Sequence, residues 1–186
     1  MISYDKLSDT DLAKLAEIDR SETIRLGYEV HEGKLVEKAV VWDSPGFAAE
    51  GEGEHSVAGQ IAFCRSHMAC GATALGAFEH EVLVGIGLFT PDIRPAMAQL
   101  AYLYVSREYR RLGIAGKITR RLLEIARDLG SERVYVSSTP SESAVGFYRS
   151  FGFELADEPV PELLALEPED IHMILELGPK RPDGRA

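Results

Sequence analysis

The chain has 186 residues, 45% of them hydrophobic and 27% charged, and this size and composition predict a single globular domain. With 30 acidic residues against 20 basic ones the net charge is −10, so a phosphate backbone would repel the chain and we expect no nucleic acid as a partner. The longest apolar stretch, Val82–Phe89, is far shorter than the roughly 20 residues that span a bilayer, so we expect no membrane partner. The first residues lack a signal pattern, which predicts a cytoplasmic protein.

The N-terminal part of the chain contains two predicted helices with a hairpin between them. Apolar residues within Leu12–Ala16 mark one face of a short helix, which Ser8 is placed to cap. Two strands are expected within Tyr28–Trp42, on either side of a glycine-containing turn. Apolar residues at helical spacing in Val57–Met68 predict the second helix, and Gly71 is placed to end it.

The next segments combine strands with one strongly patterned helix. Thr73–Thr90 predicts a second hairpin, and Leu100–Val105 predicts a strand rich in tyrosine and branched residues. A regular apolar stripe in Ile114–Leu129 predicts an amphipathic helix that ends at Gly130. A short strand is expected at Val134–Val136.

The last third of the chain completes the predicted fold. Thr139-Pro140-Ser141-Glu142 has the pattern of an N-cap, a first-turn proline and a capping-box acid, so we expect a helix that starts there and stops before Gly152. Ile171–Leu177 predicts a final strand. Helices that alternate with strands and consecutive hairpins predict an α/β fold with one mixed sheet sandwiched by helices. We therefore expect a single domain over residues 1–177 and a disordered tail over 178–186.

The loop before the striped helix is the most informative segment. It runs from Val105 to Lys117 and has glycine, alanine and two arginines where a capping side chain is usual. A helix start leaves amide N–H groups without partners, and small residues let an anionic group approach them closely. The sequence therefore favours phosphate binding here. The alternative is that Gly113 and Ala115 only allow tight packing of the helix against the sheet.

Other cofactor motifs do not fit the sequence. A P-loop needs a lysine and a hydroxyl directly after its second glycine, and the Arg110–Lys117 segment lacks them. A Rossmann fingerprint needs three glycines, and Gly85-Ile86-Gly87 lacks the third. The spacing of Cys64 and Cys70 fits neither a redox pair nor a zinc ligand set, so we expect no metal.

Two motifs together resemble a known family. Arg110–Ala115 is similar to the Arg/Gln-x-x-Gly-x-Gly/Ala pyrophosphate loop of the GNAT acetyltransferases, which use acetyl-CoA. Leu103–Val105 and Tyr109 are similar to the strand and the aromatic residue that precede this loop. Ser141–Glu154 resembles the second signature of the family, N-x-x-A-x-x-x-Y-x-x-x-G-F. The resemblance covers residues 81–177 and implies that they form an acetyl-CoA-binding core.

The resemblance also implies how the cofactor is held. Acetyl-CoA would lie along the Leu103–Val105 backbone, where a fixed N–H faces the thioester oxygen, and its pyrophosphate would bind the amides of Arg111–Gly116. Lys117, Arg120 and Arg121 continue a cationic face that either meets the 3′-phosphate of the cofactor or is solvated. The implied cofactor-binding residues are Leu103, Tyr104, Val105, Arg110, Arg111, Leu112, Gly113, Ile114, Ala115, Gly116 and Ser141.

Tyr148 is the implied catalytic residue. It occupies the position of the tyrosine that protonates the departing thiolate in many members of the family. A tyrosine has a reference pKa of about 10, so the phenol would be protonated at neutral pH, as a general acid must be, and would ionise near pH 10. The alternative is a core tyrosine on an amphipathic helix.

Two departures from the family pattern leave roles open. Ser141 stands where the family often has an asparagine that contacts the pantetheine. Gln99 stands where some members have a glutamate base, and an amide cannot accept a proton from the attacking amine. The base is then a chain of waters or another side chain. The side chains that remain open for this role, unranked, are His31, His55, His67, Tyr102 and Asp92.

These observations lead to one main interpretation and one alternative. The main interpretation is an acetyl-CoA-dependent N-acetyltransferase, in which a primary amine of a small molecule or peptide attacks the thioester directly. The alternative is a non-catalytic acyl-CoA-binding regulatory module, which Gln99 favours and Tyr148 opposes. The first helix, the Tyr28–Trp42 hairpin and the Gly51–Gly53 loop are expected to form the acceptor site, and the acidic balance favours a cationic acceptor. A homodimer is left open.

Overall fold

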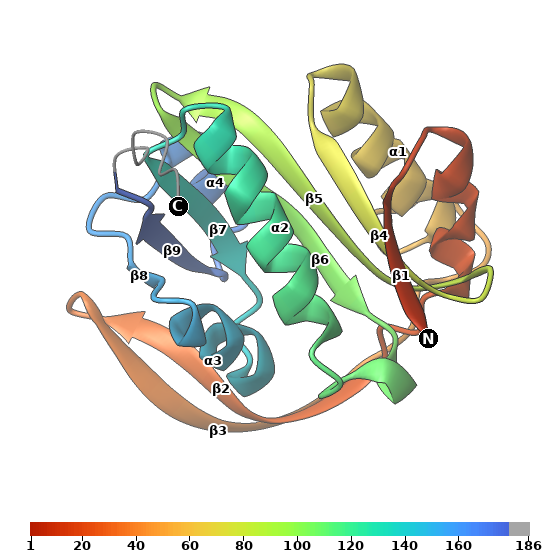
Figure 1. Ribbon diagram of the computed structural model, residues 1–186. Helices are drawn as coiled ribbons and strands as arrows, with labels where there is room; N and C mark the ends of the chain where they lie inside the picture. The colour runs from red at the N-terminus through yellow and green to blue at the C-terminus, as the bar shows by residue number, and fades with distance from the viewer. Residues whose placement is uncertain (179–186) are drawn as a thin grey trace.

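The computed structural model describes residues 1–178, which form a seven-stranded sheet and a separate two-stranded hairpin (Figure 1). In sheet order the strands are β1 (Ile2–Lys6), β4 (Thr73–Glu79), β5 (Val82–Arg94), β6 (Met97–Val105), β7 (Arg133–Ser138), β9 (Ile171–Glu176) and β8 (Glu154–Leu155). All neighbouring strands are antiparallel except β6 and β7. The hairpin consists of β2 (Glu22–His31) and β3 (Lys34–Ser44).

Helices cover both faces of the large sheet and bury a core on each. One face carries α2 (Ile114–Asp128) and α3 (Glu142–Ser150), and the other carries the 3₁₀ helix η1 (Thr10–Glu17) and α1 (Val57–Ala69). The short helices η2 (Arg107–Tyr109) and α4 (Pro161–Leu166) lie in connections. The predicted α/β fold with a mixed sheet between helices is confirmed. Within residues 1–178 no helix combines the length and the apolar composition needed to cross a membrane.

Helix α2 packs closely on the middle of the sheet because β5 contains glycines. A Cβ atom on Gly87 would lie 2.4 Å from a methyl carbon of Ile118 and 3.0 Å from Leu122, so any larger residue would push the helix away. Ile118 and Leu122 are fully buried, and burying each such side chain stabilises the fold by roughly 1.5–3 kcal/mol. Gly85 and Gly87, which lack the third glycine of a Rossmann fingerprint, therefore have a packing role.

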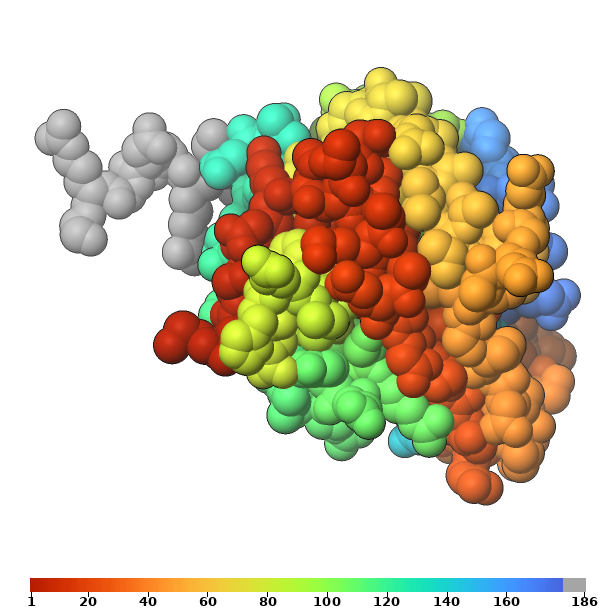
Figure 2. Space-filling view, turned by 90° about the vertical axis from the view of Figure 1, so that its right-hand side faces the viewer, coloured from red at the N-terminus to blue at the C-terminus, as the bar shows by residue number. Residues whose placement is uncertain are grey.

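The N-terminal segment closes the opposite face beside α1. The side view in Figure 2 shows residues 1–20 between α1 and the turn that joins β4 to β5. Lys14 donates a hydrogen bond to the carbonyl of Glu81 at 2.7 Å, and the Glu17 carboxylate accepts one from the Leu83 amide at 2.6 Å. These contacts tie the start of the chain to the edge of the sheet.

A β-bulge in β6 shapes the centre of the sheet. Tyr102 pairs with Leu88, but Leu100 pairs with Phe89, so Ala101 is an extra residue on β6. Such a bulge bends its strand and often interrupts pairing next to a functional site. β6 and β7 pair only from Met97 to Gln99, and the sheet opens beyond that point.

Four elements differ from their prediction. The first helix is a 3₁₀ helix rather than an α-helix, although the Asp11 carboxylate does accept hydrogen bonds from the amide and hydroxyl of Ser8. Helix α3 is capped by Ser141, not Thr139, because the Ser141 hydroxyl accepts a hydrogen bond from the Ala144 amide. Strand β1 and helix α4 were not predicted, and most of the predicted tail, residues 179–186, lies outside the described residues.

Candidate functional site

The opening between β6 and β7 is the centre of the candidate site. Beyond Gln99, the β7-facing edge of Leu100–Val105 has no strand partner within residues 1–178. The backbone groups on such an edge can pair with an extended ligand, as they do when a peptide adds to a sheet. Leu103, Tyr104 and Val105, which the sequence predicts to bind the cofactor, lie on this free edge.

The start of α2 offers a second group of backbone donors. Gly113 is the N-cap, with a φ of 79° and no capping side chain. The first helical hydrogen bond runs from the Lys117 amide to the Gly113 carbonyl, so the amides of Arg111–Gly116 have no acceptor in the described part of the chain. A Cβ atom on Gly113 would meet no atom within 4 Å. This open helix start can therefore accept an anionic group, which the helix dipole attracts.

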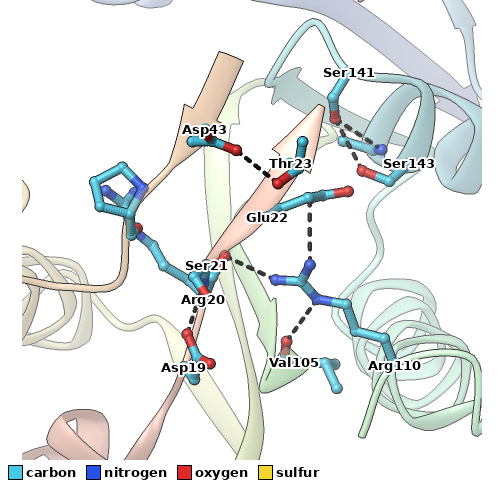
Figure 3. A network of polar contacts seen from close by, with 12 residues as sticks. Asp19, Arg20, Ser21, Glu22, Thr23, Asp43, Val105, Arg110, Ser141 and Ser143 are labelled. Atoms are coloured by element: carbon cyan, nitrogen blue, oxygen red, sulfur yellow. Dashed lines mark hydrogen bonds and ion pairs between the residues drawn. The ribbon is translucent and has the colours of Figure 1, made fainter. Parts of the chain in front are cut away.

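Arg110 points away from that helix start (Figure 3). Its guanidinium donates hydrogen bonds to the carbonyl of Val105 at 3.2 Å and to the carbonyl of Arg20 at 2.8 Å. It also lies 3.4 Å from the carboxylate of Glu22 at the start of β2. The side chain therefore joins the end of β6 to the entry of the hairpin. Cofactor binding by Arg110 stays a prediction.

The cationic residues that follow on α2 are partly engaged with aromatic rings. The Lys117 ammonium and the Arg121 guanidinium lie 4.5 and 5.0 Å from the ring centre of Tyr4, and Arg121 donates to the Tyr4 carbonyl at 3.0 Å. Arg120 lies 6.0 Å from the ring centre of Phe151. These contacts fix β1 and the end of α3 to the helix. A contact of these cations with the 3′-phosphate stays a prediction.

Tyr148 lies on α3 and is only 8% exposed. Its ring packs against Phe147 and Phe153, with ring centres 5.3 and 5.4 Å away, and its hydroxyl has no hydrogen-bond partner within residues 1–178. Burial raises the pKa of Tyr148 well above the usual value for tyrosine, and Tyr104 and Asp170 raise it further. The phenol is therefore protonated over the whole neutral and moderately alkaline range.

Tyr104 and Tyr148 approach the opening from opposite faces of the sheet. Tyr148 belongs to the core beneath α2 and α3, whereas Tyr104 packs against the core on the α1 face, with the ring of Tyr102 4.7 Å away. Burial raises the pKa of Tyr104; Arg20, which hydrogen-bonds the phenol, opposes this effect, and Asp170 adds a smaller increase. Asp170 directly precedes Ile171, which pairs with Ser138 at the end of β7, so its turn lies at the end of β7 from which the chain continues to α3.

A cavity of about 330 Å³ lies between the hairpin and the turn that carries Asp170. Its walls come from β2 and β3, from Pro140 and from the turn Pro168–Ile171. Asp170, Glu169, Tyr28 and Trp42 are among the lining residues. The hairpin was predicted to form an acceptor site and does line this cavity. The first helix and the Gly51–Gly53 loop do not.

The residues considered for the base have different surroundings. His31, His55 and Asp92 are exposed, and His67 on α1 shares a hydrogen bond of 2.7 Å with Thr90. Tyr102 is buried, and its hydroxyl has no partner within residues 1–178. Burial raises the pKa of the Tyr102 phenol far above its usual value, so it does not serve as a base at neutral pH.

The sequence analysis missed a carboxylate that lines this cavity. Asp170 belongs to the acidic turn directly before β9, and burial, with a smaller effect from Glu167, raises its pKa to about 7. Ile171 pairs with Ser138 at the end of β7, which places this turn beside the start of α3. The available signal was the acidic stretch Glu167–Asp170 immediately before a predicted strand.

Comparisons with known proteins agree with this architecture. Nourseothricin acetyltransferase superposes with a TM-score of 0.71 at 16% identity, over 95% of this chain and 98% of that chain. A putative streptothricin acetyltransferase from Bacillus anthracis, in complex with acetyl coenzyme A, gives a TM-score of 0.67 at 14% identity, over 95% and 97%. The fold is therefore that of an acetyltransferase.

Sequence comparison identifies the family. The acetyltransferase (GNAT) family model matches residues 33–153, so the chain belongs to this family. Human N-acetyltransferase 8 is 42% identical over 65 residues, which are 34% of this chain and 29% of that protein. The chain spans less than half the length of the curated relatives it matches.

Proposed function

We propose that this protein is an acetyl-CoA-dependent N-acetyltransferase that acts on a primary amine of a small molecule or peptide, with Tyr148 as the general acid. The observation that carries the proposal is the free edge of β6 leading to an uncapped α2. An extended ligand with an anionic end fits these two groups of backbone donors. Membership of the GNAT family supports acetyl-CoA as that ligand.

The residues present fit the cofactor. The amides of Arg111–Gly116 and the open space at Gly113 suit a pyrophosphate, and the unpaired edge of Leu103–Val105 suits the pantetheine arm. When bound, acetyl-CoA supplies an activated acetyl group. An N–H on the free edge would stabilise negative charge on the thioester oxygen, which is worth several kcal/mol in a site that excludes water.

Tyr148 has the environment of a general acid. Its pKa is raised, so it keeps its proton until the sulfur begins to leave with negative charge. The Tyr148 ring packs against Phe147, against Phe153 and against the core beneath α2. Packing of this kind restricts the ring to one orientation.

Hydrogen exchange and thermal unfolding with CoA test the cofactor site. CoA should protect the Arg111–Gly116 amides and raise Tm, because a ligand that binds only the native state stabilises it. Gly113→Val should abolish both effects. Gly130→Val is the matched control, since Gly130 also has a positive φ of 86° and an open Cβ position but lies at the other end of α2. CoA binding by Gly113→Val at wild-type affinity would exclude this site.

Turnover separates the enzyme from the alternative of an acyl-CoA-binding module. Gln99 favours the module because it is 6% exposed and its amide accepts no proton. Release of free thiol from acetyl-CoA should depend on an added primary amine. We expect turnover with at least one of a short unblocked peptide, lysine and a diamine. CoA binding without amine-dependent thiol release would support the module instead.

A further inference from the structure

The carboxylate of Asp170 has no role in the function proposed so far. It lines the cavity between the β2–β3 hairpin and the Pro168–Ile171 turn. Within residues 1–178 it forms no ion pair and no side-chain hydrogen bond, in contrast to Glu29, which pairs with Lys38 at 3.1 Å on the opposite wall. A half-buried carboxylate without a partner is unusual, because burying a charge is costly unless the charge is paired.

The turn that carries Asp170 is held rigidly by a buried histidine. His172 is 5% exposed, and its Nε2 lies 3.0 Å from the carbonyl oxygen of Glu167. A carbonyl only accepts hydrogen bonds, so Nε2 carries a proton and donates it. Nδ1 of the same ring lies 2.8 Å from the hydroxyl of Tyr135, which in turn accepts a hydrogen bond from the Val160 amide.

The Asp170 amide closes the same turn. It donates to the Glu167 carbonyl at 3.2 Å, so one carbonyl oxygen receives both the His172 ring and the Asp170 backbone. Ile171, the next residue, is paired with Ser138 of β7. The position of the Asp170 carboxyl is therefore fixed relative to the opening of the sheet rather than left to a free loop.

We propose that Asp170 is the proton acceptor for the attacking amine, and that the cavity it lines is where the amine binds. This inference rests on the proposed acetyl transfer. The amine loses two protons in the reaction. The inference assigns one of them to Asp170, which lines the cavity, and the other to Tyr148 on α3. It also explains how the reaction can proceed although Gln99 on β6 cannot accept a proton, because the base then comes from the turn before β9.

The proton balance is complete with these two residues. The acceptor enters as an ammonium group and gives one proton to the Asp170 carboxylate, which later releases it to solvent. The amine nitrogen then forms a bond to the acetyl carbon as the carbon–sulfur bond breaks. Tyr148 gives its proton to the departing sulfur and regains one from the nitrogen. The product amide keeps the remaining proton, and free thiol leaves.

The charged and titratable groups around Asp170 support an amine at this place. Glu167 and Glu169 lie on its own turn, Glu29 and Lys38 on the hairpin, Tyr104 on β6 and Tyr148 on α3. Glu29 and Lys38 neutralise each other. The remaining charge at the cavity is negative, which attracts a cationic acceptor and opposes an anionic one.

Kinetics of Asp170→Asn test the assignment, with Asp157→Asn as the matched control. Both variants make the same change and remove one negative charge, but Asp157 is exposed in the loop after β8 and does not line the cavity, so only the first removes the proposed base. We expect Asp170→Asn to lower kcat at pH 7 by about 10²–10³-fold, within the range that general bases supply. The deficit should shrink as the pH approaches the pKa of the amine, about 10, because the amine then deprotonates without help. Asp157→Asn should stay within about threefold of wild type.

Two kinetic results would overturn the inference. One is Asp170→Asn turning over at the wild-type rate at pH 7. The other is a deficit that is constant from pH 6 to 10, since that would indicate a structural or binding role. If the wild-type protein binds CoA but releases no thiol with any amine, the proposed acetyl transfer itself fails and the base assignment fails with it.

A titration that needs no acceptor gives an independent readout. In protein labelled with ¹³C at the aspartate carboxyl, the resonance absent from Asp170→Asn reports the ionisation of this residue. We expect its midpoint near pH 7 rather than near the reference value of about 3.9. Tyr148→Phe and Tyr104→Phe should each perturb this resonance, because Asp170 contributes to the raised pKa of both phenols. A midpoint near 4 would exclude Asp170 as a base that exchanges protons at neutral pH.

Discussion

The guanidinium of Arg110 lies 3.4 Å from the carboxylate of Glu22, and this pair joins the loop before α2 to the first residue of β2. Two parts of the proposed site therefore depend on one side chain. The loop leads to the open helix start, and β2 forms a wall of the acceptor cavity. In addition, Arg110 donates to the backbone carbonyls of Val105 and Arg20, so its contacts extend beyond the ion pair.

This geometry predicts different costs for removing the two partners. Glu22→Gln should lower the free energy of unfolding by less than about 1 kcal/mol, because the pair is partly exposed. Arg110→Gln should lower the free energy of unfolding by about 2–3 kcal/mol, because the carbonyls of Val105 and Arg20 also lose a charged hydrogen-bond donor. Urea unfolding of both variants measures these differences.

The CoA affinity of the same variants distinguishes structure from direct binding. We expect Arg110→Gln to change CoA affinity much less than Gly113→Val does. A loss of CoA affinity in Arg110→Gln at unchanged stability would instead show that the side chain binds the cofactor, as the sequence motif predicts.

Tyr148→Phe should lower kcat by about 10²-fold or somewhat less, the low end of the range for a general acid, because a thiolate is already a tolerable leaving group. Fold and CoA affinity should be retained, since Phe fills the same space. The sequence alone predicts that kcat falls near pH 10 as Tyr148 ionises. The raised pKa of the buried phenol moves this fall to higher pH, so wild-type kcat should still be on its plateau at pH 10.

Single-turnover rates of Tyr148→Phe check this prediction without interference from product release. An unchanged rate across the pH range would remove Tyr148 from the mechanism.

The order of elements and the cofactor loop could be predicted because they follow local rules. The stripe in Ile114–Leu129 gave α2 almost to the residue, and the absence of a capping side chain at its start corresponds to the Gly113 N-cap. The hairpins followed from alternating residues and a turn. These signals lie within one element and need no tertiary contact.

The acceptor side could not be predicted because it depends on contacts that are distant in the sequence. Asp170 is brought to the end of β7, and to the cavity that Pro140 also lines, only because β9 pairs with β7. The bulge at Ala101 lies on the strand next to β7 in the sheet. Neither the pairing order nor the bulge has a local signature in the sequence. The direction of the Arg110 side chain likewise depends on the position of β2, which no motif specifies.

Tyr102→Phe should leave the free energy of unfolding unchanged or raise it by about 1 kcal/mol. The Tyr102 hydroxyl is buried without a hydrogen-bond partner within residues 1–178, so removing it removes a desolvation penalty. Tyr135→Phe is the matched control, because its hydroxyl is also buried but contacts both His172 and the Val160 amide. We expect Tyr135→Phe to lower the free energy of unfolding by about 1–3 kcal/mol. Equal losses in the two variants, measured by urea unfolding, would contradict this account of Tyr102.

Ser141→Ala should lower the free energy of unfolding by about 1 kcal/mol, the usual effect of removing an N-cap. The Ser141 side chain is 2% exposed and its hydroxyl accepts from the Ala144 amide at 3.2 Å, so capping occupies it. Ser143→Ala is the control, because Ser143 is exposed and caps no amide, although its hydroxyl shares a hydrogen bond of 3.1 Å with that of Ser141. CoA affinity of Ser141→Ala, measured by calorimetry, should stay near wild type. A clear loss of affinity at unchanged stability would support the cofactor contact that the family resemblance implies.

Asp170→Asn should stabilise the protein relative to wild type as the pH rises from about 4 to 7. The pKa of Asp170 is raised to about 7 in the folded state and lies near 3.9 in the unfolded state, so in this window only the unfolded state is ionised. The unfolded state then binds fewer protons than the folded state, and stability falls with increasing pH. Through this group, the free energy of unfolding of wild type should fall from about pH 4 to pH 7 and change no further above pH 7. Asp170→Asn lacks this dependence. Urea unfolding at pH 4, 5, 6, 7 and 8 gives the difference between the two proteins, in which the other groups cancel. A difference that is flat from pH 4 to 8 would mean that Asp170 ionises normally in the folded protein, and the amine would then need another base.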